Sequence, residues 1–139
     1  MAAFYSSEGK ISEAEASLKK AISLEPQNSS LSVLLANFYK RIGKPDQAVA
    51  AYQEAIAKSE DDADIKAMLA DYYVDRHQPD KASALVDQIL SKNSKQGRAN
   101  LVKAKLLIGK GKNDDAIAIL TNLEQEYPRW AEPFYLKAL

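Results

Sequence analysis

The chain has 139 residues, of which 46% are hydrophobic and 27% charged, a composition typical of a folded domain large enough to bury a core. Its 19 basic and 19 acidic residues give a formal net charge of zero, which argues against a surface that tracks nucleic acid or an anionic membrane. The sequence contains no cysteine, so disulfides, thiolate catalysis and cysteine-ligated zinc are excluded.

Amphipathic segments separated by turn residues follow one another along the chain. Residues 1–28 contain Gly9 and then an apolar run around Ala14, which predicts the end of one helix, a turn and a second helix. Residues 29–62 contain two apolar runs at helical spacing, separated by Gly43, which predicts a helical hairpin. The residues expected to pack from its first helix are Leu31, Leu34, Leu35, Phe38, Tyr39 and Ile42.

The same arrangement recurs in the rest of the chain. Residues 63–96 and residues 97–130 each hold two more amphipathic runs, and residues 131–139 begin another first helix. Pro45 and Pro79 fall at the start of second helices, where the missing backbone N–H costs little. The sequence therefore predicts three complete helical hairpins between two partial ones.

Four sets of equivalent residues recur at intervals of 34 residues. A fixed period of this length indicates stacked copies of one structural unit. Alanine at two of the sets allows paired helices to approach closely, and stacking supplies the core that a single hairpin cannot bury. The sets are Ala2, Ala36, Ala70, Ala104 and Ala138; Ala14, Ala48, Ala82 and Ala116; Tyr5, Tyr39, Tyr73 and Leu107; and Gly9, Gly43, His77 and Gly111.

This pattern resembles the tetratricopeptide repeat (TPR) family over essentially the whole chain. The matching residues are Leu35, Ala36, Tyr39, Gly43, Ala48, Tyr52 and Ala55, with Pro26 and Pro128 at the closing proline. The sequence departs from the family pattern at His77, which replaces the turn glycine, and at Glu60 and Ser94, which replace the closing proline. The resemblance implies an all-α fold, a right-handed superhelical solenoid of antiparallel helix hairpins, in a single domain spanning residues 1–139. Because both ends fall within a repeat, it also suggests an excerpt from a longer array.

The residues offer little for catalysis or for a bound metal or cofactor. The only histidine, His77, lies at a turn position otherwise held by glycine, and we interpret it as a tolerated turn residue. The acidic residues at 60–64 lack the spacing of a calcium loop and are expected to cap a helix. Residues 109–112 have glycines and lysines but not the spacing of a phosphate-binding loop. We therefore expect a protein that is not an enzyme and has no cofactor or metal.

In the TPR family, the first helix of each repeat lines a concave groove that receives a partner. The equivalent positions here predict a groove that grows more apolar toward the C-terminus and carries mixed charge. A partner with apolar anchors and both signs of charge would suit it, although the opposite charges of adjacent helices could instead pair with each other. The predicted groove residues are Val33, Asn37, Lys40, Asp71, Val74, Arg98, Leu101, Lys105, Ile108 and Tyr135, together with Ala67 of the same series.

These observations predict a non-catalytic protein-protein interaction scaffold whose partner is a protein or a peptide segment. One alternative is a self-association module, a homo-oligomer joined through Phe134, Tyr135 and Leu136. Another is the TPR arm of a larger secretion, export or enzyme assembly. Asp71 places a negative charge in the groove and argues against a clamp for the C-terminal carboxylate of chaperones.

The chain is expected to bind no nucleic acid and to lack a membrane span. Its densest apolar run, residues 101–108, is interrupted by Lys103 and Lys105 and falls short of the roughly 18 residues that a spanning helix needs. No signal peptide is recognisable at residues 1–7. Cytoplasm and periplasm are both compatible with the sequence.

Overall fold

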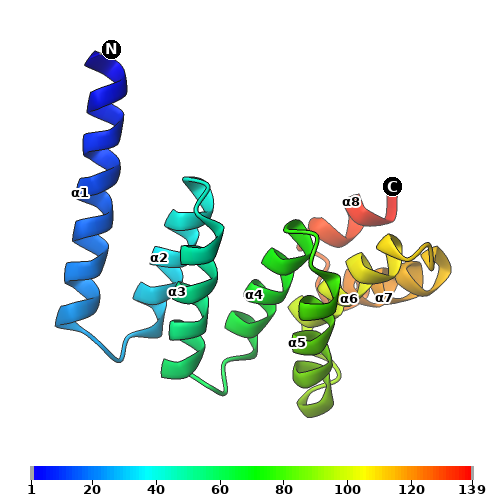
Figure 1. Ribbon diagram of the computed structural model, residues 1–139. Coiled ribbons are helices and arrows are strands. Elements are labelled where there is room, and N and C mark those ends of the chain that lie inside the picture. Colours follow the sequence, from blue (N-terminus) through cyan, green and yellow to red (C-terminus); the bar gives the residue numbers. More distant parts are fainter. Residues whose placement is uncertain (1, 139) are drawn as a thin grey trace. The chain divides into compact units, whose positions relative to one another are not determined.

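The computed structural model describes residues 2–138, and the side chains of residues 8–137. Within that range the chain forms eight α-helices and no strand, so the predicted all-α fold is confirmed (Figure 1). The helices are α1 (Ala2–Leu24), α2 (Ser29–Arg41), α3 (Pro45–Lys58), α4 (Ala63–Asp75), α5 (Pro79–Lys92), α6 (Gly97–Gly109), α7 (Asn113–Glu126) and α8 (Glu132–Ala138).

The helices group into two compact units. Unit 1 comprises Met1–Ile65 and contains α1, α2 and α3. Unit 2 comprises Lys66–Leu139 and contains most of α4 together with α5 to α8. The boundary falls in the first turn of α4.

Unit 1 is built on the antiparallel pair α2 and α3 (Figure 1). Ala36 and Ala48, one from each predicted alanine set, are completely buried. The Tyr52 hydroxyl of α3 donates a 2.8 Å hydrogen bond to Oδ1 of Asn37 on α2. These contacts form the tightly closed hairpin that the repeat pattern predicts.

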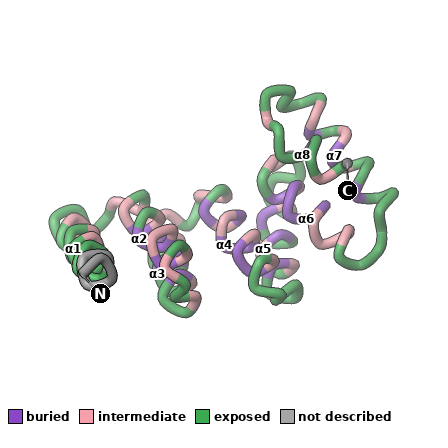
Figure 2. Tube along the Cα trace, turned by 90° about the horizontal axis from the view of Figure 1, so that it is seen from above, coloured by how far each residue is buried: buried purple, intermediate pink, exposed green. Residues whose placement is uncertain are grey.

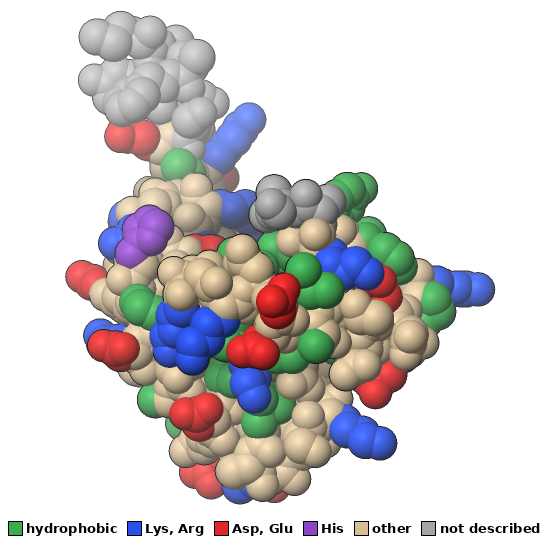
Figure 3. Space-filling model, turned by 90° about the vertical axis from the view of Figure 1, so that its right-hand side faces the viewer, with side chains coloured by type: hydrophobic (Ala, Val, Ile, Leu, Met, Phe, Trp, Pro, Cys, Tyr) green, Lys and Arg blue, Asp and Glu red, His purple; other side chains and the backbone are tan. Residues whose placement is uncertain are grey.

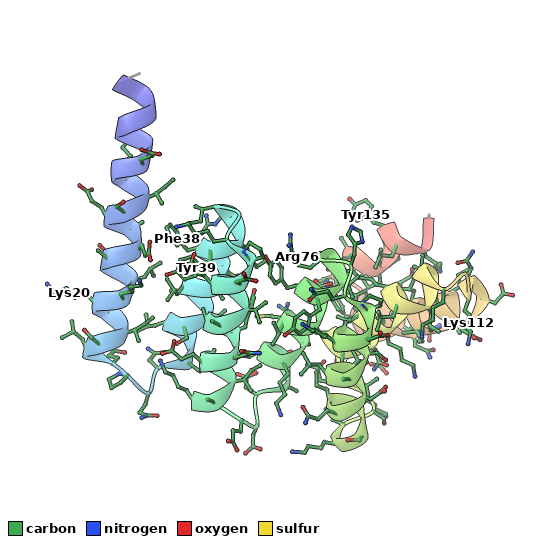
Figure 4. The ribbon with its side chains drawn as sticks, viewed as in Figure 1. Lys20, Phe38, Tyr39, Arg76, Lys112 and Tyr135 are labelled. Carbon is green, nitrogen blue, oxygen red and sulfur yellow. The ribbon has the colours of Figure 1, made fainter. Side chains whose placement is uncertain are left out.

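Helix α1 packs against α2, on the side of α2 that faces away from α3. Tyr39 of α2 points toward α1 and donates a 2.8 Å hydrogen bond to Oε1 of Glu15 (Figure 4). The pKa of Tyr39 is raised, first by burial and then by this hydrogen bond to a carboxylate. Lys19, one turn along α1, lies 2.8 Å from the same carboxylate oxygen.

Unit 2 has its clearest core between α6 and α7. Leu101 and Ala104 of α6 form one buried cluster with residues of α7, and Trp130 and Leu136 pack against it. Helix α8 packs on α7, where the ammonium group of Lys137 lies 3.0 Å from Oε2 of Glu124. The α7 residues of the cluster are Ala116, Leu120 and Leu123.

Three turns between paired helices share one backbone geometry. The residues at the predicted turn positions, Gly43, His77 and Gly111, have φ of 74°, 57° and 78°. The residue that follows each of these three donates its backbone N–H to the carbonyl of the residue five positions before itself, over 2.8–2.9 Å. At the first turn, for example, Lys44 donates to Tyr39. This is the hydrogen bond of the Schellman motif, which uses a left-handed residue to end a helix. The predicted turns are therefore confirmed at these three positions.

The turn predicted at Gly9 is wrong, because α1 runs without interruption through it. The second helices α3 and α5 begin at a proline, which disfavours a helical conformation at the residue before it. The position equivalent to those prolines is Ile11, which can continue a helix. A single glycine within a helix costs only about 1 kcal/mol relative to alanine, so α1 can continue through Gly9.

One residue of the predicted packing stripe of α2 also differs from expectation. Leu34 is 52% exposed, whereas its equivalent in α6, Val102, is 2% exposed. Helix α5 packs against α6, and the corresponding neighbour of α2 is α1. Helix α1 therefore covers α2 less completely than α5 covers α6.

Replacing His77 by glycine should raise the free energy of unfolding by up to about 1 kcal/mol, because only glycine adopts a left-handed conformation without steric cost. Urea unfolding followed by circular dichroism measures the change. Gly43→Ala is the matched control and should lower stability by about 1 kcal/mol, since it introduces a β-carbon at φ 74°. A His77→Gly variant less stable than the wild type would contradict this reading.

Candidate functional site

A group of charged side chains in unit 2 joins three helices that are each the first of a repeat. The ammonium group of Lys105 on α6 lies 2.8 Å from Oδ1 of Asp71 on α4 and 2.8 Å from Oε1 of Glu132 on α8. Asp71 and Lys105 are 34 residues apart, so they occupy the same position in successive repeats. We call Asp71, Lys105 and Glu132 the ionic cluster.

Exposure differs between the members of the ionic cluster. The Lys105 side chain is 17% exposed, whereas Asp71 is 38% and Glu132 45% exposed. Two carboxylates share one ammonium group, so the cluster carries a net charge of −1. A partner would therefore meet carboxylate oxygens rather than the lysine.

The lysine of the ionic cluster stays charged. Burial by itself would lower the pKa of Lys105, but the hydrogen bonds to Asp71 and Glu132 raise it by more, and the net pKa lies above the ordinary lysine value of 10.5. The charge of Lys105 is thus neutralised by carboxylates of the protein itself. The pairing of opposite charges between adjacent helices, left open by the sequence, is what the structure shows at Asp71 and Lys105.

Apolar side chains accompany the ionic cluster one turn further along the same helices. Val74 on α4 and Ile108 on α6 occupy equivalent positions and are both partly exposed. Ile108 also lines a cavity of about 430 Å³ with Ile117 and Leu136. Tyr135 on α8 is 74% exposed and extends away from its helix (Figure 4).

Leu101 does not belong to this surface. It is 4% exposed and packs with Ala104 and Leu120 in the core of the α6–α7 hairpin. The sequence placed it in the groove because it follows the same helical face as Lys105 and Ile108. Closure of the hairpin covers that part of the face, and Ala67, its equivalent in α4, is likewise 1% exposed.

The predicted groove residues of unit 1 form a separate group on α2. Asn37 accepts the hydrogen bond of Tyr52 through Oδ1, which fixes its amide group. Lys40 places its ammonium group 5.9 Å from the centre of the Tyr52 ring, a cation–π distance. Val33 is partly exposed on the same helix. Arg98, predicted with the groove of the later repeats, is exposed in the first turn of α6.

Sequence reasoning missed Glu132, which completes the ionic cluster. The signal was present, because Glu132 is 34 residues after Arg98 and so reverses the charge at a position already assigned to the groove. A search for charge reversals within each set of equivalent residues would have found it.

Among the acidic residues at 60–64, Asp62 caps the start of α4. Oδ1 of Asp62 accepts hydrogen bonds from the backbone N–H groups of Asp64, at 3.0 Å, and Ile65, at 3.2 Å.

Across the described part of the chain, no group of three or more potential ligand residues is arranged to hold a metal ion. Among the described helices, none has the length and apolar character to cross a membrane.

Replacing Lys105 by methionine should lower the free energy of unfolding by about 1 kcal/mol, because Asp71 and Glu132 then face each other without a cation. Urea unfolding measures the loss. The triple variant Asp71→Asn/Glu132→Gln/Lys105→Met should recover part of it, since the repulsion is removed as well. Lys95→Met, at an exposed loop position, is the control; an equal loss there would contradict a specific role for Lys105.

The difference in the free energy of unfolding between wild type and Lys105→Met should become smaller at high pH. The pKa of Lys105 is raised on folding, so its contribution is fully present below the unfolded value of about 10.5 and is lost as pH rises through the higher folded pKa. The difference should therefore be constant between neutral pH and about pH 9 and shrink above about pH 10.5. A difference that grew with alkalinity would be inconsistent with the ion pairs.

Solved structures with this fold are TPR proteins. A tetratricopeptide repeat protein from Parabacteroides merdae ATCC 43184 matches with a TM-score of 0.76 and 25% identity, over 94% of this chain and 51% of that one. The type IV pilus biogenesis factor PilW matches with a TM-score of 0.75 and 23% identity, over 96% of this chain and 62% of that one. YrrB, a TPR protein with an unusual peptide-binding site, matches with a TM-score of 0.64 and 21% identity, over 98% of this chain and 70% of that one.

The chain thus spans about half the length of the first of these structures. No curated protein sequence matches it significantly. The family model described as tetratricopeptide repeat matches three overlapping segments, residues 5–72, 43–106 and 73–139. With this match over almost the whole sequence and the helical hairpins described above, the chain belongs to the tetratricopeptide repeat family, whose fold serves as a scaffold for protein–protein interaction.

Proposed function

We propose that this protein is a non-catalytic scaffold that holds an extended segment of a partner protein across α4, α6 and α8 of unit 2. The observation that carries the proposal is the ionic cluster, which ties the first helices of three successive repeats into one surface. A ligand crossing this surface contacts the first helix of each of these repeats in turn.

The chemistry of the surface defines the partner. The exposed carboxylates of Asp71 and Glu132 outnumber the covered ammonium group of Lys105, which favours a basic side chain on the ligand. Val74 and Ile108, one turn away, offer apolar contact to a neighbouring ligand residue. The proposed ligand is therefore a peptide segment with a lysine or arginine close to an aliphatic or aromatic residue.

Mixed character is visible on the side of the molecule seen in Figure 3. Acidic and basic side chains are interspersed there with hydrophobic ones, and neither sign of charge dominates. Such a surface suits a protein segment better than the regular negative charge of nucleic acid. Peptide binding by YrrB, a protein of the same fold, supports the choice of a peptide as ligand.

Synthetic peptides provide the test, with fluorescence anisotropy as the readout. Peptides combining arginine with a neighbouring leucine or phenylalanine should bind more tightly than versions with glutamate in place of arginine. The Asp71→Asn variant should weaken binding about three- to fivefold, because one exposed charge contact is worth up to about 1 kcal/mol. The Ile108→Asp variant should weaken it about tenfold or more, since it removes an apolar contact.

Asp87→Asn is the matched control, because Asp87 is an exposed acidic residue on α5 outside the surface. It should leave peptide affinity unchanged. Circular dichroism must show the same helicity in every variant. Equal binding of the arginine and glutamate peptides, or equal effects of Asp71→Asn and Asp87→Asn, would refute the assignment of this surface.

A further inference from the structure

Lys105 lies between the two carboxylates that the surface proposed for peptide binding offers to a ligand. Its ammonium group is 2.8 Å from Oδ1 of Asp71 and 2.8 Å from Oε1 of Glu132. These two oxygens are therefore no more than twice that distance apart, and a single cation contacts both carboxylates at once. The space between Asp71 and Glu132 thus has the size that one basic group requires.

The carboxylates are more accessible than the lysine that joins them. Helices α4 and α6 are buried along much of their length (Figure 2), and the Lys105 side chain stays close to this core with an exposure of 17%. Lys105 contacts one oxygen of each carboxylate, whereas a carboxylate has two acceptor oxygens. Because Asp71 and Glu132 both reach solvent, a ligand can approach the second oxygen of each.

Exposure of Glu132 is characteristic of its position in the repeat. The equivalent residues are Ser30 in α2, Asp64 in α4 and Arg98 in α6, and each of them is exposed although both helices of its repeat are present. The Glu132 carboxylate therefore lies at a position that complete repeats leave open to solvent.

We propose that Lys105 is an internal competitor for the basic side chain of the ligand and limits this surface to one ligand cation. The inference rests on the proposed function, because it concerns the same carboxylates. Lys105 neutralises one of the two negative charges, so the ionic cluster offers a ligand a net charge of −1. A ligand guanidinium group beside the cluster is attracted by two carboxylates and repelled by one ammonium group at a comparable distance.

Removal of Lys105 leaves a net charge of −2 at the same place. A ligand guanidinium group can then take the position of the ammonium group and bridge Asp71 and Glu132 through charge-assisted hydrogen bonds. Peptide affinity should rise even though the protein becomes less stable. A lysine that served only to hold the helices together would have the opposite effect on affinity, because its loss would loosen the surface.

The competition also determines which segments the surface selects. One basic residue compensates the charge that Lys105 leaves, so a second basic residue beside it finds no uncompensated carboxylate in the ionic cluster. Polybasic segments, which a purely acidic surface would bind most tightly, therefore gain little advantage here. The favoured ligand carries an isolated arginine or lysine next to an apolar residue.

Fluorescence anisotropy with three labelled peptides tests the proposal at one fixed ionic strength, because salt screens these charges. The peptides carry one arginine next to leucine, two adjacent arginines next to leucine, or glutamate in place of the single arginine. On the wild type, the second arginine should improve affinity less than about twofold. Lys105→Met should bind the one-arginine peptide about fivefold more tightly than the wild type does, and the second arginine should add about fivefold more.

Three further variants separate competition from a general change in charge. Lys105→Arg restores the cation and should return the affinity to near the wild-type value. Lys95→Met removes an exposed lysine from the loop between α5 and α6, outside the surface, and should change affinity less than about twofold. Asp71→Asn added to Lys105→Met should cancel the gain. Circular dichroism must show the same helicity in every variant.

The outcomes distinguish this inference from the proposed function. If the wild type prefers the arginine peptide to the glutamate peptide but Lys105→Met binds the arginine peptide no more tightly, the competitor role is overturned and the peptide surface stands. If the wild type shows no such preference, the surface itself is refuted and the inference with it. Should Lys105→Met fail to fold, the wild type still decides, because a gain of fivefold or more from the second arginine contradicts the limit to one cation.

Discussion

Close packing of alanine residues between paired helices is the constraint from which the other features of this protein follow. Ala104 and Ala116 lie in the same buried cluster, and their equivalents in the earlier hairpins have no exposed surface. A methyl group at these positions lets two helix backbones approach, which brings larger residues such as Leu101 and Leu120 into the same core. The left-handed turns at Gly43, His77 and Gly111 return the chain at the angle that this contact requires.

Regular stacking turns a period in the sequence into a surface. Because successive repeats are built alike, residues 34 positions apart lie next to each other, as the ion pair between Asp71 and Lys105 demonstrates. Glu132, on the first helix of the next repeat, adds a second carboxylate to the same lysine from a position equivalent to that of Arg98. The result is a surface on which the lysine is covered and the carboxylates are exposed, a distribution of charge that is set by burial as much as by residue type.

The sequence by itself determined the helical repeat, its period and the positions of the turns at Gly43, His77 and Gly111, because each depends on local spacing. It also assigned Asp71 of one helix, and Lys105 and Ile108 of the equivalent helix in the next repeat, to the predicted groove. Only the tertiary structure decided that Leu101 lies in the core, that Lys105 is held by two carboxylates and that α1 continues through Gly9. The first two outcomes depend on which side of a helix a neighbour covers, and the third on whether the backbone at a glycine takes a helical or a left-handed conformation. Helical periodicity places residues on a face, but only packing between helices determines which part of that face meets solvent.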